Sequence, residues 1–293
     1  MQVAFLIQCH KNPSQINRLT QKLTSESGTD VYVHLDAKSN AIRQDVIIND
    51  RIKLLPICKT HDVTWGGYSQ CLATLSMLEF ALDSGKNYDF FVLLSGQDYP
   101  IKKMRECIDF LSEHCNEPFM DFVPLDSTDY KNFEARNSVF FPRFLIGRGK
   151  AIALLRKVYI DLCTAMKLYR KPLFDQFFFG SSWWAMPGLY AEEIVQYCKD
   201  NPGINEFFRH SLCPDECMFQ TIAKTLFPNS NFNHKLTYTD WSENQSGPKT
   251  LQITDIDSLL KQNDNYFFAR KFDAANSMDV LDYIDEAIEK LNG

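Results

Sequence analysis

Hydrophobic positions in the first hundred residues alternate between strand-like runs and helix-like spacing. Continuous apolar runs, typical of buried strands, occur at residues 3–7, 31–36, 52–57 and 90–95. Asn12 before Pro13 is typical of a helix start and predicts a helix to about Leu23. Leucines at helical spacing predict a second helix after Ser69, which can cap it. Strands that alternate with helices predict an α/β fold with a mainly parallel, doubly wound sheet and flanking helices.

The pattern is less regular after residue 100. Apolar spacing there predicts helices near residues 102–114, 149–166, 189–200, 214–226 and 277–291. No repeat, low-complexity run or linker rich in proline and glycine interrupts the chain. We therefore expect one domain that spans residues 1–293.

The net charge, the cysteines and the lack of a signal peptide indicate what kind of protein this is and where it is located. The net charge of −6 argues against a nucleic-acid partner, because the phosphate backbone selects basic surfaces. The nine cysteines follow no pairing pattern, which predicts free thiols and a reducing compartment. The sequence shows no signal-peptide pattern and no apolar run long enough to cross a bilayer. These features predict a cytoplasmic protein.

The strand at residues 90–95 leads into a loop with a single acid, Asp98. In open α/β sheets, ligands bind where such loops leave the carboxyl ends of the strands. Enzymes of this architecture that use nucleotide sugars usually hold a divalent metal with two acids spaced Asp-x-Asp. That spacing occurs only at Asp255 and Asp257, which we interpret as a chance match or a helix cap. A metal-dependent enzyme that uses Asp98 or these two acids remains an alternative.

Two adjacent cations, Arg270 and Lys271, lie between Phe268 and Phe272. An alternating extended segment would send one of them inward beside the aromatic rings. Cations fixed in a site with little water stabilise a departing diphosphate, as a metal would. Solvated surface cations are the ordinary alternative.

Acids and aromatic residues supply further candidates. Asp215 and Glu216 follow Pro214 at a predicted helix start, where acids commonly complement the helix dipole, and where an acid in a cleft could act as a general base. Asp36 ends the second strand and could bind a ribose or pair with Lys38. Small and aromatic residues at 180–184 suit the lining of a pocket, with one of the two tryptophans in the core.

Six motifs occur in the order seen in one enzyme family. They are HLDAK (34–38), VTWGGYS (63–69), LSGQDYP (94–100), GSSW (180–183), PDE (214–216) and FARKF (268–272). Together they make the chain resemble the branching glycosyltransferases, from about residue 3 to residue 273. That family joins the core-2 and I-branching β-1,6-N-acetylglucosaminyltransferases to the peptide O-xylosyltransferases.

The resemblance implies a GT-A type fold and an inverting, metal-independent transfer from a UDP-sugar to a hydroxyl of a glycan or glycolipid acceptor. It implies a nucleotide-binding half at about 1–100 and an acceptor-binding and catalytic half at about 101–293. Glu216 matches the catalytic base, and no metal or other cofactor is expected. The positions matched to substrate binding are Cys9, His10, Asp36, Asp98, Ser182, Trp183, Trp241, Arg270 and Lys271.

The chain also departs from the family. Animal members carry a membrane anchor, a stem and disulfides, so the resemblance points to a compact, cytoplasmic, bacterial-type member in polysaccharide synthesis, with peripheral membrane association left open. Xylosyltransferases tend to have an acid at Ser182, which favours N-acetylglucosamine as the donor sugar. The residues around Arg270 are closer to those of the xylosyltransferases, so UDP-xylose remains an alternative donor. A carbohydrate-binding protein without catalysis is an alternative of another class.

Overall fold

The computed structural model describes residues 1–243, 247–260 and 266–290. Its main sheet has the strand order β3-β2-β1-β4-β6, in which β6 runs antiparallel to β4 and the other pairs are parallel. The strands are β1 (Val3–Cys9), β2 (Thr29–Leu35), β3 (Ile52–Leu54), β4 (Phe90–Ser95) and β6 (Ala185–Pro187). The predicted α/β fold with a mainly parallel sheet is confirmed. All four predicted strands are present, and the third is shorter than predicted.

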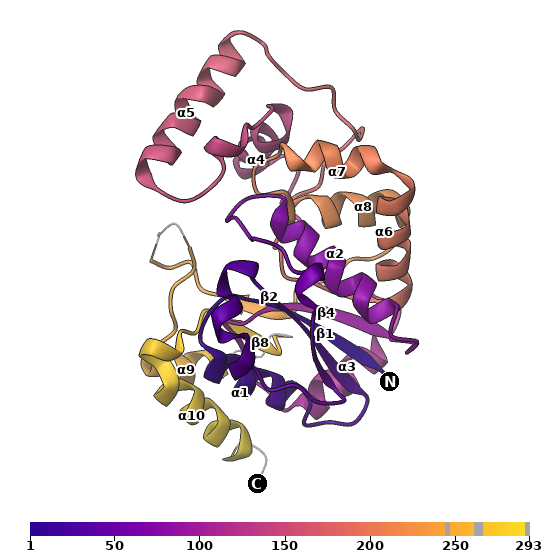
Figure 1. The fold of residues 1–293 in the computed structure, drawn as a ribbon, viewed down its shortest axis with the longest axis vertical. Coiled ribbons are helices and arrows are strands. Elements are labelled where there is room, and N and C mark those ends of the chain that lie inside the picture. Colours follow the sequence, from indigo (N-terminus) through magenta and orange to yellow (C-terminus); the bar gives the residue numbers. More distant parts are fainter. Residues whose placement is uncertain (244–246, 261–265, 291–293) are drawn as a thin grey trace.

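Helices bury both faces of this sheet (Figure 1). Along β1, Val3, Phe5 and Ile7 join one hydrophobic cluster, while Ala4 and Leu6 join another. The first cluster includes side chains of α1 (Pro13–Leu23), α3 (Met104–Glu113), α9 (Ile253–Leu260) and α10 (Ala274–Lys290). The second includes side chains of α2 (Ser69–Leu82), α6 (Gly188–Asp200), α7 (Pro202–Arg209) and α8 (Met218–Leu226). Burial on both faces explains why the strands are continuous apolar runs.

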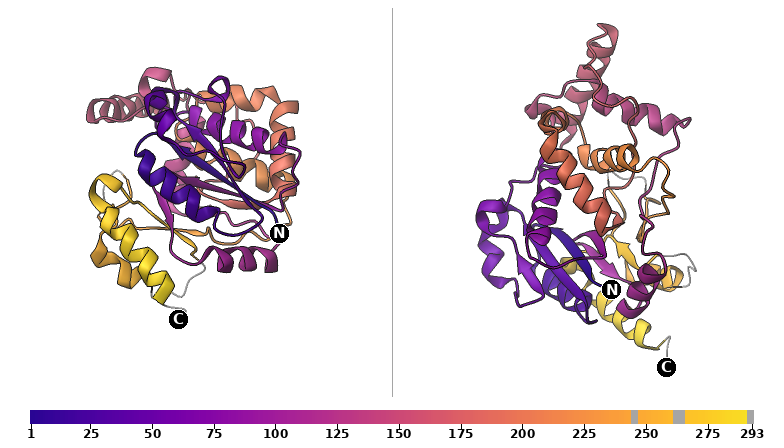
Figure 2. Two further views of the ribbon diagram at one scale, coloured as in Figure 1. Left: turned by 60° about the horizontal axis from the view of Figure 1, so that its bottom comes forward. Right: turned by 90° about the vertical axis from the view of Figure 1, so that its right-hand side faces the viewer.

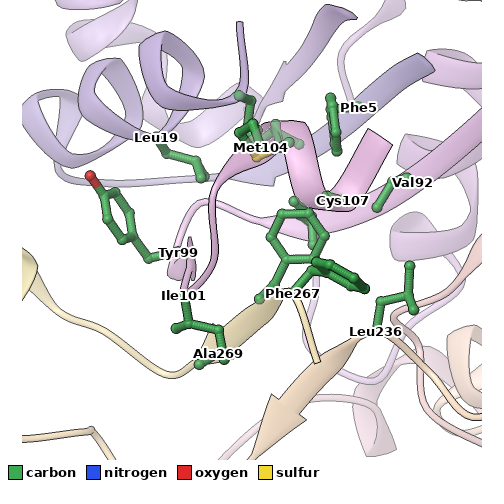
Figure 3. Close-up of a cluster of buried hydrophobic side chains, with 14 of the residues drawn as sticks. Phe5, Leu19, Val92, Tyr99, Ile101, Met104, Cys107, Leu236, Phe267 and Ala269 are labelled. Atoms are coloured by element: carbon green, nitrogen blue, oxygen red, sulfur yellow. The ribbon is translucent and has the colours of Figure 1, made fainter. Parts of the chain in front are cut away.

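The two clusters also tie the chain together across residue 100. Figure 3 shows part of the first one, in which Phe5 and Val92 of the main sheet lie near Met104 and Cys107 of α3. Each cluster contains residues from both sides of position 100. The division into a nucleotide-binding and an acceptor-binding half stays a prediction.

A second sheet, which the sequence pattern did not predict, brings distant segments to the site. It contains β5 (Asp98–Pro100), β8 (Phe268–Arg270) and β7 (Thr237–Thr239), in the order β5-β8-β7. The antiparallel pairing of β5 with β8 places Asp98 opposite Arg270. Three-residue strands are too short to show a period of their own, so only tertiary pairing defines them.

The helices predicted after residue 100 all occur, with α5 at Lys150–Ala165. Three more, α4 (Thr128–Ser138), α7 and α9, are not among the predicted ranges; α4 buries only Tyr130 and Asn137, so it lacks an apolar stripe. Ser69 does not cap α2, because its hydroxyl accepts the Thr64 N–H in the preceding turn. Among the described residues, no helix has both the length and the apolarity to cross a bilayer.

The segment at residues 214–226 differs most from its prediction. Pro214–Glu216 form a single 3-10 turn, and α8 begins only at Met218. Cys213, with φ of 51°, and Cys217, with φ of −142°, break the helical geometry on either side of the turn. The two acids therefore lie ahead of the helix, and the helix-dipole explanation for their position does not hold.

Candidate active site

The carboxyl ends of β1, β2 and β4 meet at one edge of the main sheet. Parallel pairing places Cys9 beside Leu35, and the Asp36 N–H donates to the Cys9 carbonyl at 2.9 Å. The turn after β4 approaches closely, because a Cβ on Gly96 would lie 2.7 Å from the Cβ of Cys9. Only glycine allows that approach. Cys9, His10 and Asp36 are thus brought together.

Asp36 serves the local structure at this edge. Its side chain is buried and accepts the Lys38 N–H at 2.9 Å, which caps the 3-10 helix Ala37–Asp45. The Lys38 ammonium lies 3.7 Å from the same carboxylate. The pairing with Lys38 considered from the sequence is therefore present, together with a helix cap that the sequence analysis did not propose, and a contact with uridine stays a prediction.

Cys9 and His10 differ in exposure, but both are mainly uncharged near pH 7. Burial, with a smaller effect of Asp36, raises the pKa of the Cys9 thiol to about 12, so the thiol stays protonated. Partial burial and then Lys11 lower the pKa of His10, and Lys271 adds to this effect. His10 is therefore mostly neutral near pH 7.

Arg270 is fixed from two sides at the end of β8. Its guanidinium carbon lies 4.2 Å from the centre of the Trp183 ring, and its Nε lies 3.5 Å from Asp98 Oδ1. Asp98 is completely buried, and its other oxygen accepts the Ser95 N–H at 2.9 Å. Burial raises the pKa of Asp98 to about 6, although Arg270 opposes the shift. In this arrangement Asp98 contacts Arg270, and its direct contact with substrate stays a prediction.

Lys271 belongs to a group of four cations, here called the basic cluster: Lys11, Arg148, Arg270 and Lys271. Partial burial lowers the pKa of Lys271, and the other three cations lower it further by repulsion. Lys11 is paired with Asp273 at 2.6 Å. Repelling cations held together form a site for an anion with several charges. Sequence reasoning missed Lys11 and Arg148, although Lys11 follows a strand end, where ligand-binding residues gather.

Asp215 is half-buried and lies beside Ser182 and Trp183. Its Oδ2 accepts the Ser182 hydroxyl at 2.7 Å and an N–H of the Gln70 amide at 3.3 Å. Its Oδ1 is buried and has no hydrogen-bond partner among the residues that the structure describes. Asp215, Ser182 and Trp183 line one small cavity together with Gln8 of β1. Burial, followed by repulsion from Glu216, raises the pKa of Asp215 to about 7.

Glu216 is the accessible member of this turn. Its side chain is 36% exposed, and Oε2 accepts an N–H of Arg136 at 2.5 Å. Arg136 lies on the unpredicted helix α4, so no pattern in the sequence indicated this ion pair. The contacts from Glu216 through Asp215 to Ser182 connect the acid turn to Trp183 and thus to Arg270.

Trp241 lies apart from these contacts, after β7, with 58% of its surface exposed. An exposed ring of this kind could stack on an acceptor sugar, and that role stays a prediction. Asp255 accepts the Gln252 N–H at 2.9 Å in the first turn of α9, which agrees with the helix-cap interpretation. Within the described ranges, no group of three His, Cys, Asp or Glu side chains is placed to hold a metal ion.

Comparison with known proteins adds the family. A model of the Core-2/I-Branching enzyme family matches residues 3–262. The chain belongs to this family. The family membership predicted from the six motifs is therefore confirmed.

The individual relatives are distant. Xylosyltransferase 2 of Pan troglodytes is 23% identical over 97% of this chain, and xylosyltransferase oxt of Drosophila melanogaster is 23% identical over 98%. The chain spans about one third, 33%, of the length of these curated relatives. The solved structure of mouse xyloside xylosyltransferase 1 covers 95% of this chain, and this chain covers 100% of it, at 10% identity and a TM-score of 0.37. At this TM-score the structural similarity supports no conclusion about this chain.

Proposed function

We propose that the protein is a glycosyltransferase that transfers a sugar from a UDP-sugar to a hydroxyl of a glycan or glycolipid acceptor, with inversion and without a metal ion. One observation carries the proposal. Trp183 links the basic cluster and the acid turn, which are far apart in the sequence, because Arg270 lies over its ring and Asp215 lines a small cavity together with it.

In this proposal the basic cluster binds the diphosphate. When the bond between the sugar and the diphosphate breaks, UDP leaves with additional negative charge. Arg270 is held by Asp98 and Trp183 before substrate arrives, so its charge needs no reorganisation during the reaction. Lys271, Lys11 and Arg148 supply the further charges that a divalent ion would otherwise provide.

Glu216 is the proposed general base. It would accept the proton of the acceptor hydroxyl as that oxygen attacks the anomeric carbon from the face opposite the leaving UDP. The ion pair with Arg136 orients the carboxylate, and its 36% exposure allows an acceptor to reach it. The Asp215 carboxylate has one buried oxygen and accepts the Ser182 hydroxyl with the other, so it is less accessible for this step.

The donor is proposed to be UDP-N-acetylglucosamine, because Ser182 stands where xylosyltransferases tend to carry an acid, with UDP-xylose as a second candidate. The names of the relatives favour xylose. So does one contact: the Asp215 carboxylate lies 2.7 Å from Ser182, the position at which xylosyltransferases tend to carry an acid. An acid therefore lies next to position 182 in the folded protein, although it belongs to another segment of the chain.

A panel of UDP-sugars tests the proposal. Binding and slow hydrolysis are measured for UDP-N-acetylglucosamine, UDP-xylose, UDP-glucose and UDP-galactose, with and without excess EDTA. We expect one donor to be preferred and its turnover to persist in EDTA. Binding without turnover of any donor, also with acceptor glycans present, would support a carbohydrate-binding protein. Loss of activity in EDTA that Mn²⁺ restores would support a metal-dependent enzyme, and NMR of the product anomer tests inversion.

A cytoplasmic location and a role in polysaccharide synthesis belong to the same proposal. All nine cysteines are free thiols in the structure, which suits a reducing compartment. Thiol titration of denatured, unreduced protein purified from its native cells should therefore count all nine. A clearly smaller count would contradict the cytoplasmic location.

A further inference from the structure

Helix α5 has two apolar faces, and within the described part of the chain only one of them is packed. Cys163, Tyr159 and Ile160 on the inner face contact a small cluster that includes Phe141 and Leu145. This cluster is separate from the two that bury the main sheet. Figure 2 shows α5 projecting from the body of the molecule, at the end far from the C-terminus.

The outer face of α5 consists of Leu154, Leu155, Val158 and Leu162. These side chains are 65%, 58%, 58% and 54% exposed. Their spacing of three or four residues places them along one side of the helix. Isolated exposed leucines need no explanation, but a contiguous stripe of large aliphatic side chains on a projecting helix marks an interaction surface.

The charge around this face is strongly positive. Residues 143–171 contain eight Lys or Arg and a single acid, Asp161, whereas the whole chain has a net charge of −6. Lys150 and Lys157 lie on α5 itself and are exposed. A helix with an apolar face, flanked by many cations, is typical of segments that lie in the interface of an anionic membrane.

We propose that the outer face of α5 docks on a lipid surface that carries anionic headgroups. The aliphatic side chains would enter the boundary between headgroups and acyl chains, while the surrounding cations contact the headgroups. Charge disfavours a second copy of this chain as the occupant, because two faces with the same positive charge would repel each other.

Docking in this way would bring the candidate active site close to the membrane. The guanidinium carbon of Arg148, which belongs to the basic cluster, lies 5.3 Å from the centre of the Trp65 ring. That of Arg156 on α5 lies 6.0 Å from the same ring. The start of α5 therefore borders the basic cluster. A glycolipid acceptor would then meet the enzyme at the surface that holds it. The docking itself goes beyond the proposed function and does not require that function to be correct.

Vesicle flotation without any UDP-sugar or acceptor tests the docking separately from catalysis. Vesicles of equal parts phosphatidylglycerol and phosphatidylcholine are compared with pure phosphatidylcholine. We expect the wild-type protein to float with the anionic vesicles. The variant with Leu154→Ser, Val158→Ser and Leu162→Ser should bind at least about tenfold less, because buried aliphatic area contributes to the affinity. The charge reversals Lys150→Glu and Lys157→Glu should weaken binding by about tenfold or more.

Matched controls keep the outcome specific. Ile47→Ser, Ile48→Ser and Leu189→Ser alter aliphatic side chains that are 45%, 63% and 59% exposed elsewhere, and should leave binding unchanged. Lys199→Glu with Lys290→Glu is the control for charge. Equal binding by the α5 serine variant, or no preference for anionic vesicles, overturns the proposal. A wild-type dimer in sedimentation that the α5 serine variant abolishes also overturns it, because the face would then be an interface between copies.

Discussion

The end of β8 and the turn before α8 each place a buried charged residue next to an accessible one. The Arg270 side chain is only 11% exposed and precedes Lys271, and Asp215, whose Oδ1 is buried, precedes Glu216, whose side chain is 36% exposed. Burial has different consequences in the two regions. It raises the pKa of Asp215 to about 7, so that this acid is largely neutral over much of the range below pH 7, whereas an arginine stays charged in proteins.

This difference separates the proposed roles of the two regions. The end of β8 can hold a permanent charge out of water because that charge is an arginine beside Asp98 and an aromatic ring. The acid turn can keep two adjacent carboxyl groups because one of them gives up its charge. The accessible Glu216 then remains the candidate to exchange a proton with an acceptor.

The largest expected effect comes from removing the base. Glu216→Gln should lower transfer by roughly 10²–10⁴-fold, because a positioned general base is lost, and should leave affinity for the UDP-sugar nearly unchanged. Steady-state kinetics and donor binding by calorimetry measure the two quantities. Glu206→Gln, at a side chain that is 68% exposed, is the matched control. Near-normal transfer by a folded Glu216→Gln protein would show that Glu216 is not the base.

The next effect tests the fixed cation. Arg270→Ala should weaken UDP binding by roughly 10–100-fold, the range for a lost charge-assisted hydrogen bond, and should slow transfer further. Arg270→Lys should recover only part of the affinity, since an ammonium lacks the planar surface that lies over Trp183. Arg105→Ala changes an arginine that is 67% exposed and serves as the control. Full recovery in the lysine variant would mean that charge alone matters.

A smaller effect is expected at the accessible cation. Lys271→Ala should weaken UDP binding by roughly 2–5-fold, as for a partly exposed ion pair, because Lys11 and Arg148 continue to supply charge. Increasing salt should reduce the difference between the variant and the wild type. A loss as large as that of Arg270→Ala would contradict the distinction between the buried and the accessible cation.

The last effect concerns stability and pH rather than activity. Because the folded protein binds the Asp215 proton more tightly than the unfolded chain, this group contributes most below pH 4, and its contribution falls as the pH rises to about 7. The stability of Asp215→Asn relative to wild type should therefore rise over this window, by at most a few kcal/mol, in urea unfolding at several pH values. Asp126→Asn, at an exposed position, should show no such trend. Parallel pH profiles for wild type and Asp215→Asn would exclude a raised pKa at Asp215.

Patterns in the sequence were enough to predict the main sheet and most helices. The strands at 3–7 and 90–95 are buried on both faces, so each one is a local apolar run that can be recognised without its neighbours. Helix α4 escaped prediction because most of its side chains lie outside the core. The three-residue strands β5, β7 and β8 were not predicted because pairing between distant segments defines them.

By itself, the sequence determined the α/β order of elements, the family motifs and the residue types at the candidate site. Only the tertiary structure decided which of these residues meet, such as Lys11 and Arg148 with Lys271, and which acid is buried. It also left the outer face of α5 uncovered by the described residues, although that helix is rich in aliphatic side chains. The physical reason is that charge interactions and burial depend on distances through space, whereas the sequence records only the order along the chain.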